Sequence, residues 1–170
     1  SHLNRGPAGQ EGSLQIQDGQ FLRPDGSRVR FLGTNLCFAH AFPDKDLAPG
    51  IARRMAALGI NCVRFHHMDN QYKPRGIWDP AYKDHQHIDA EQLDRLDWMV
   101  YQLKQCGIYT DLNLHVSRQF SEADGFPASE ALPKYDKGID NYEPRMIQLQ
   151  REYADALLTQ RKFATYLIER

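Results

Sequence analysis

The sequence lacks several features that would assign it to a class at once. No apolar run approaches the roughly 20 residues that span a bilayer, and no charged-then-apolar signal pattern opens the chain. The 21 Lys and Arg residues balance 22 Asp and Glu, so no basic stripe predicts nucleic-acid binding. We therefore expect a soluble chain without a nucleic-acid or membrane partner, and both a secreted and a cytoplasmic location stay open.

Cysteine is also scarce. The chain has three, Cys37, Cys62 and Cys106. An odd count argues against a disulfide framework, and the spacing matches no zinc motif. Because each lies among apolar residues, we expect buried free thiols.

What the sequence does contain is one phrase that occurs twice. Residues 59–67 read GINCVRFHH and residues 107–115 read GIYTDLNLH, each after a helix-like stretch. Both read as a Gly that ends a helix, a buried strand, and polar groups at the strand's carboxyl end. Strands that alternate with helices predict a parallel sheet, and chemistry in such folds is usually placed at that end of the strands.

The rest of the chain fits this pattern. Residues 1–13 are rich in Gly, Ser and polar residues and predict a flexible arm, with a single domain over 14–170. We expect strands at 14–17, 20–23, 29–35, 61–66 and 108–114, and helices at 47–58, from Asp89 to Cys106, and from Glu143-Pro144 onward. The tail, 161–170, fits a fourth parallel strand or a continued helix, and we favour the helix because no Gly or Pro interrupts 145–170. The fold class is α/β: a half TIM-type barrel of three to four parallel strands with helices, preceded by a short β-hairpin.

Polar residues gather at the strand ends. Arg64 would be costly in a buried strand, so it predicts a carboxylate or ligand partner. Asp111, Asn113 and His115 are two residues apart and are expected on one face of their strand, as in a polar funnel at the top of a barrel. The alternative is an internal ion pair between Arg64 and Asp111, with the histidines as satisfied core residues.

Two further interpretations concern histidines and aromatic residues. His66 and His115 could converge on a divalent metal, because imidazole suits zinc, but no carboxylate–histidine spacing supports a site, so we expect no cofactor. Aromatic side chains also crowd two long loops, where they suit stacking on sugar rings or packing as lids on the domain itself: Tyr72, Trp78, Tyr82, Phe120, Phe126 and Tyr135.

Together these pieces resemble a known family. Residues 31–35 (FLGTN), 58–66 (LGINCVRFH), 96–100 (LDWMV) and 107–118 (GIYTDLNLHVSR) are similar, in this order, to the N-terminal half of retaining glycoside hydrolases of the β/α-barrel clan A, with cellulase-like family 5 as the nearest relative. The resemblance spans about 20–158. It implies hydrolysis of O-glycosyl bonds in β-linked glucans, as in cellulases and β-glucosidases, with an oligo- or polysaccharide as substrate.

The resemblance also implies roles for single residues. Arg64 would support the catalytic nucleophile, and His115 would line the subsite where the sugar is cleaved. Asn35 and His66 would stand at the rim of the site. We add Arg118 and Trp78 as expected substrate contacts from the two loops.

The sequence departs from the family in its carboxylates. The family's acid/base is a Glu that follows an Asn, and its nucleophile is a second Glu on a later strand, but this sequence contains no Asn-Glu pair. Retaining enzymes need two carboxyl groups about 5 Å apart and inverting enzymes about 6.5–9.5 Å. The substitute candidates near the strand ends are Asp69, Asp111, Glu122 and Asp124, with Glu169 if the tail is a strand.

Three hypotheses follow from this departure. The first is a glycoside hydrolase-like half-barrel that self-associates as a homo-oligomer, because an isolated half exposes sheet edges. The second is a non-catalytic carbohydrate-binding half-barrel or fragment. The third is a metal-binding protein on the same scaffold.

Overall fold

A computed structural model describes residues 4–159. Its strands are β1 (Gln15–Gln17), β2 (Gln20–Leu22), β3 (Arg28–Val29), β4 (Gly33–Cys37), β5 (Cys62–His66) and β6 (Tyr109–Leu112). Its α-helices are α1 (Ala48–Ala57), α2 (Ala90–Gln105) and α3 (Pro144–Thr159). Short 3-10 helices are η1 (Phe38–Ala41), η2 (Glu122–Asp124), η3 (Ser129–Ala131), η4 (Lys134–Asp136) and η5 (Ile139–Asn141).

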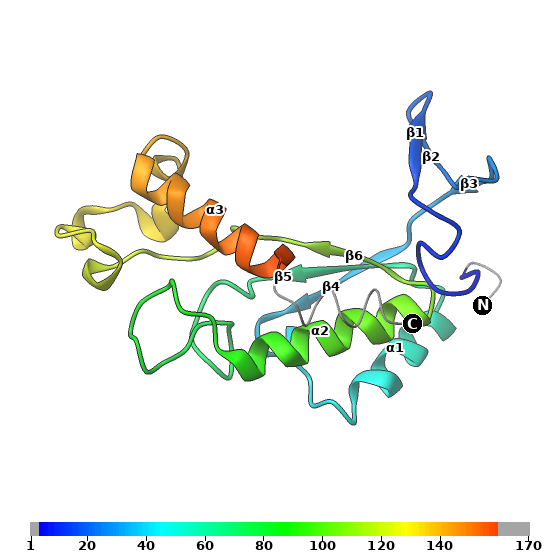
Figure 1. Cartoon of the computed structure of the whole chain (residues 1–170), viewed down its shortest axis with the longest axis horizontal. Coiled ribbons are helices and arrows are strands. Elements are labelled where there is room, and N and C mark those ends of the chain that lie inside the picture. The colour runs from blue at the N-terminus through cyan, green and yellow to red at the C-terminus, as the bar shows by residue number, and fades with distance from the viewer. Residues whose placement is uncertain (1–3, 160–170) are drawn as a thin grey trace.

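The strands form two separate sheets (Figure 1). β1, β2 and β3 make a small antiparallel sheet, whereas β4, β5 and β6 run parallel in that order. The α/β class and the parallel sheet of βα units are therefore confirmed, with three parallel strands in residues 4–159. The tail 161–170, predicted as helix or strand, lies outside the described residues, as does the candidate Glu169.

The predicted strand at 29–35 is wrong in one respect, because it is two strands. β3 ends at Val29 and β4 begins at Gly33. The buried amide of Asn61 occupies the break: its Nδ2 donates to the Arg30 carbonyl at 2.8 Å, and its Oδ1 accepts from the Leu32 N–H at 2.7 Å. The side chain thus replaces the backbone pairing that a continuous strand would have made.

Helices α1 and α2 cover one face of the parallel sheet (Figure 1). Val63 and Phe65 on β5 are fully buried, and they alternate with the partly exposed Cys62, Arg64 and His66. Figure 1 shows α1 and α2 side by side along one side of this sheet, and α3 joins the same core through Tyr153 and Leu157. Because strand side chains alternate between faces, the opposite face carries the polar residues.

The N-terminal arm contacts the body of the protein. Asn4 Nδ2 donates to the carbonyls of Ile60, at 3.2 Å, and Cys106, at 3.0 Å, and the Ala8 N–H donates to the Lys104 carbonyl at 2.8 Å. Gly107 has a φ of +72°, and a Cβ there would lie 2.7 Å from the Gly6 carbonyl oxygen. Composition predicted a flexible arm, but the described part of it packs over the point where α2 turns into β6.

The three cysteines are free, as expected, but each is only partly buried. Cys37 and Cys62 lie on the strand face that the helices leave open, and Cys106 follows the last turn of α2, which explains their exposure. Within residues 4–159, no helix is long and apolar enough to cross a membrane.

Candidate functional site

The open face of the parallel sheet presents a row of polar residues across its three strands. Asn35 on β4 is in register with Arg64 on β5, and Arg64 is in register with Asp111 on β6. Two residues further towards the carboxyl ends of these strands, Cys37 on β4 is in register with His66 on β5. Asn35, Arg64 and Asp111, three of the residues that the strand-end pattern predicted, therefore lie side by side.

Arg64 is held by two partners, Asp111 on β6 and Asn113 directly after that strand. Its Nε lies 3.9 Å from Asp111 Oδ2, a loose and exposed ion pair, which contributes little to stability. The Asn113 amide faces the guanidinium with its oxygen, because a nitrogen there would meet only donors, and it accepts from Nε at 2.9 Å. Arg64 thus keeps a defined orientation, while its side chain remains 42% exposed on the open face.

His66 completes this group. Its Nδ1 lies 3.3 Å from the same end of the Asn113 amide. Burial lowers the pKa of His66, and the neighbouring His67 and Arg64 lower it further. The imidazole is therefore neutral at pH 7, and because its Nδ1–H faces the Asn113 amide oxygen, Nε2 is left as an acceptor for a hydroxyl group. We call Arg64, His66, Asp111 and Asn113 the sheet cluster.

His115 lies apart from the sheet cluster. β6 ends at Leu112, and His115 follows in the loop, where its Nε2 lies 2.7 Å from Asp140 Oδ2 on η5. Among the described residues no hydrogen bond or ion pair joins His115 to Arg64 or His66. The expectation that Asp111, Asn113 and His115 share one face is wrong for His115, because the strand alternation stops before it.

Asp69 is a structural anchor and not a free carboxylate. It is 0% exposed, and its Oδ2 accepts hydrogen bonds from three consecutive backbone N–H groups, those of Val116 at 2.7 Å, Ser117 at 3.2 Å and Arg118 at 3.1 Å. It therefore fixes the start of the loop after β6. We remove Asp69 from the catalytic candidates because no solvent or ligand reaches its oxygens.

Trp78 and Arg118 are also buried, so neither offers a surface to a sugar. Trp78 donates from Nε1 to the Asp69 carbonyl at 2.9 Å. The Arg118 guanidinium lies 4.7 Å from the Trp78 ring centroid and 4.5 Å from that of Phe120, and it donates to the Leu149 carbonyl at 3.1 Å. The expectation that both bind substrate is corrected: they hold the two loops to α3.

Asp111 and Glu122 remain exposed, but they occupy different places. Asp111 lies in the sheet cluster, whereas Glu122 is on η2 in the loop after β6. Within residues 4–159 no hydrogen bond or ion pair links Glu122 to the sheet cluster. The structure thus brings together Asn35, Arg64, His66 and Asp111 from the predicted set.

Sequence reasoning missed two buried carboxylates in the loop after β6. Asp136 accepts from the Phe120 N–H at 2.7 Å, and Asp140 accepts from the Gly138 N–H at 2.8 Å and lies against His115. Burial raises the pKa of Asp136, outweighing the Phe120 hydrogen bond, and nearby Asp140 raises it further. The only sequence signal was two aspartates four residues apart around a glycine, in a loop without helical or strand periodicity.

The described residues do not support the metal-binding interpretation. Within residues 4–159, no group of three or more His, Cys, Asp or Glu side chains could hold an ion. His66 faces Asn113, and His115 faces Asp140. The two histidines that were proposed to share a metal therefore have separate partners.

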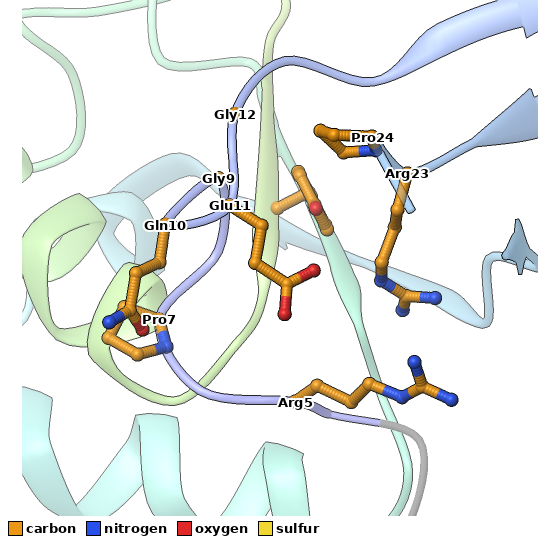
Figure 2. A pocket seen from close by; sticks show the side chains of 9 residues that line it. Arg5, Pro7, Gly9, Gln10, Glu11, Gly12, Arg23 and Pro24 are labelled. Carbon is orange, nitrogen blue, oxygen red and sulfur yellow. The ribbon is translucent and has the colours of Figure 1, made fainter. Parts of the chain in front are cut away.

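A small pocket lies at the opposite end of the sheet from the two long loops. Figure 2 shows the charged side chains that border it, those of Arg5 and Glu11 on the arm and Arg23 after β2. Tyr109, the first residue of β6, lines it as well. Because this pocket adjoins the amino end of β6, it is separate from the sheet cluster.

Comparisons with known proteins agree with this geometry at the level of fold. A solved structure of an endo-1,4-β-mannanase from Rhizomucor miehei matches with a TM-score of 0.66, covering 89% of this chain and 43% of that chain. The fold is part of a β/α barrel. The sequences are 19% identical, so the likeness shows the fold alone, and this chain spans less than half the length of the mannanase. No family model matches the sequence, and no curated protein matches it either.

Proposed function

We propose that this chain supplies the sugar-binding side of a glycoside hydrolase-like barrel that acts on β-linked glucans. The observation that carries the proposal is the sheet cluster: an oriented, half-exposed Arg64 beside a neutral His66, on the face that a β/α barrel turns inward. Donors and acceptors at fixed spacing on a concave surface suit sugar hydroxyls. The likeness to a mannanase supports a glycoside hydrolase-like scaffold and adds β-1,4-mannan to the substrates worth testing.

Within this proposal Arg64 orients a carboxylate or a hydroxyl group, and Asn35 and His66 contact the sugar at the rim. Asp111 is the candidate acid or base, because it is the exposed carboxylate of the sheet cluster. Glycoside hydrolysis requires a second carboxyl group within about 10 Å. Glu122 is the candidate for this role if the loop that carries it closes over the face.

We further propose that a second copy of the chain covers the open face. In the described residues, β4 and β6 each have one edge without a strand partner, and an unpaired edge favours association. Beside β4 lies a groove of about 530 Å³ whose apolar lining includes Leu36, Phe42, Leu47 and Ile51. Because the chain matches 43% of the mannanase, a second copy would bring the assembly near the size of a full barrel.

Hydrolysis and binding assays test the proposed function. We expect the protein to release sugar from carboxymethyl-cellulose, a chromogenic β-glucoside or β-1,4-mannan. Asp111→Asn should lower kcat/KM at least about a hundredfold, as loss of a general acid or base does. Arg64→Ala should lower it at least about tenfold, because its oriented hydrogen bonds to the ligand are lost.

Glu130→Gln is the matched control, because Glu130 is an exposed carboxylate on η3 in the same loop as Glu122. It should leave the rate unchanged, whereas Glu122→Gln should lower it. Activity that is insensitive to Arg64→Ala and Asp111→Asn would reject the assignment of the sheet cluster.

The second candidate is a non-catalytic carbohydrate-binding role. It is favoured by one observation: Asp69, a carboxylate near the strand ends, is fully committed to backbone N–H groups. Oligosaccharide binding that depends on Arg64, with no hydrolysis of any of the three substrates, would support this role over catalysis.

A further inference from the structure

The loop between β5 and α2 presents one aromatic ring to solvent. Tyr82 is 55% exposed, and its ring stacks on that of His87, with centroids 3.9 Å apart and planes 10° from parallel. His87 covers one face of the Tyr82 ring, so the exposed area of this side chain includes the opposite face. Trp78, Phe120 and Phe126 in the two long loops are buried, and Tyr142 is exposed but has no stacked ring partner among the described residues.

The buried carboxylate of Asp84 holds His87, one member of this ring pair, in place. Asp84 Oδ2 lies 2.7 Å from His87 Nδ1, and Asp84 Oδ1 accepts from the Gln86 and His87 N–H groups at 3.0 and 3.1 Å. The Asp79 N–H donates to the His87 carbonyl at 2.8 Å. His87 therefore has a set orientation, and Tyr82 rests on a firm support, which lowers the entropy cost of binding against its free face.

We infer that Tyr82, supported by His87 and Asp84, forms a stacking subsite for a sugar ring of a β-linked glycan, apart from the sheet cluster. The face of an aromatic ring carries negative charge and attracts the polarised C–H bonds on the flat side of a pyranose. Lys83, next to Tyr82 in the sequence, is exposed as well, and a polar group of this kind suits the hydroxyls at the edge of such a ring. The inference rests on the proposed function for its ligand class.

The position of this loop agrees with the inference. Figure 1 shows the loop between β5 and α2 and the loop after β6 at the same end of the parallel sheet, opposite the antiparallel sheet. These loops follow the carboxyl ends of their strands, where substrates of β/α barrels bind. A glycan chain bound at the sheet cluster could extend towards Tyr82, which would then hold a sugar unit outside the central subsite.

Titration with β-1,4-mannopentaose and cellopentaose, followed by calorimetry and by NMR of labelled tyrosine rings, tests the subsite. Tyr82→Ala should weaken binding of one or both sugars about threefold to tenfold, the range of a single aromatic stacking contact. Tyr82→Phe should bind within about twofold of the wild type, because the ring face remains. In the wild type, the Tyr82 ring resonances should shift as sugar is added.

Tyr142→Ala is the matched control. Tyr142 is 82% exposed and has no stacked ring partner among the described residues, so this variant should bind as the wild type does. His87→Ala should weaken binding less than Tyr82→Ala does, because it removes the support but leaves the stacking ring.

The outcomes separate the subsite from the proposed function. If Tyr82→Ala binds as the wild type does, or the Tyr82 ring does not respond to sugar, the subsite is rejected, while a loss in Arg64→Ala would still support the sheet cluster. If Tyr82→Ala weakens binding and Arg64→Ala does not, the subsite stands and the proposed role of the sheet cluster falls. Absence of binding to either sugar rejects both.

Discussion

At the scale of single residues, the same side-chain type has two different roles in this protein. Arg64 is half-exposed and oriented by a neighbouring amide. Arg118 is buried among aromatic rings and backbone carbonyls. Burial lowers the pKa of Arg118 to about 10, which still leaves it charged at pH 7. A buried cation without water must be satisfied by its neighbours, so Arg118 stabilises the fold, whereas Arg64 is available to a ligand.

Asp124 should make stability depend on acid pH. Burial raises the pKa of this carboxyl, but the His85 side chain and hydrogen bonds from the His85 N–H, at 2.8 Å, and from the N–H and hydroxyl of Ser121, at 2.9 and 2.8 Å, outweigh burial and lower it below its ordinary value. A depressed folded-state pKa stabilises the fold above the unfolded pKa of about 3.9, and this contribution is lost as pH falls through the folded value. Asp124→Asn should cost about 2 kcal/mol of unfolding free energy at pH 7, measured by urea unfolding.

The difference between the wild type and Asp124→Asn should narrow as pH falls below the unfolded pKa of about 3.9, because the unfolded chain then binds a proton that the folded carboxyl does not yet hold. Asp46→Asn, at an exposed position before α1, should change stability by less than about 0.5 kcal/mol. An equal cost for Asp124→Asn at pH 7 and pH 2 would mean that its charge does not contribute.

Residue pattern predicted some of the site and missed the rest for physical reasons. Strand alternation identified Arg64 and Asp111 as neighbours, because register follows from the buried positions of each strand. It could not place Asp69, Trp78 or His115, whose positions depend on loop conformation and not on a period. For example, nothing in the sequence around Asp69 predicts that three consecutive backbone N–H groups, those of residues 116–118, would donate to its carboxylate.

At the scale of elements, Asn61 connects the two sheets. Its amide bridges Arg30 and Leu32 across the break between β3 and β4, and its own backbone carbonyl accepts from the Tyr109 N–H at 2.9 Å. The sequence predicted the helices and β5 closely, because their apolar periods are long. It could not predict the break, because residues 29–35 have the composition of one continuous strand.

Asn61→Ala should therefore destabilise the protein by about 1–2 kcal/mol, since it removes two part-buried hydrogen bonds and leaves the Leu32 N–H and the Arg30 carbonyl without their side-chain partner. The measurement is the midpoint and slope of urea unfolding. Asn70→Ala is the matched control, because the Asn70 amide makes one long hydrogen bond, of 3.4 Å, to the Ser117 carbonyl, and we expect a loss below about 0.5 kcal/mol. Equal losses of unfolding free energy in the two variants would contradict a stabilising role for the Asn61 bridge.

At the scale of the whole molecule, α1 and α2 cover one face of the parallel sheet (Figure 1), and the other bears the sheet cluster. The described chain exposes Phe21, Phe31 and Leu32 near the antiparallel sheet, and Leu47 beside the groove at β4. Apolar surface next to an unpaired strand edge favours association. A site built on the open face excludes water only when another element covers it, so the oligomeric state and the function are connected.

The whole-molecule prediction is a dimer that uses the groove beside β4. Light scattering after size exclusion should give the mass of two chains at micromolar concentration, and Leu47→Glu should weaken self-association at least about tenfold, because it places a charge against the apolar partner surface. Leu158→Glu is the matched control: Leu158, on α3, is 59% exposed and Leu47 is 55% exposed, but Leu158 is not part of the groove lining. A wild-type protein that stays monomeric at every concentration would rule out completion by a second copy, and a dimer that Leu158→Glu disrupts as strongly as Leu47→Glu would move the interface away from β4.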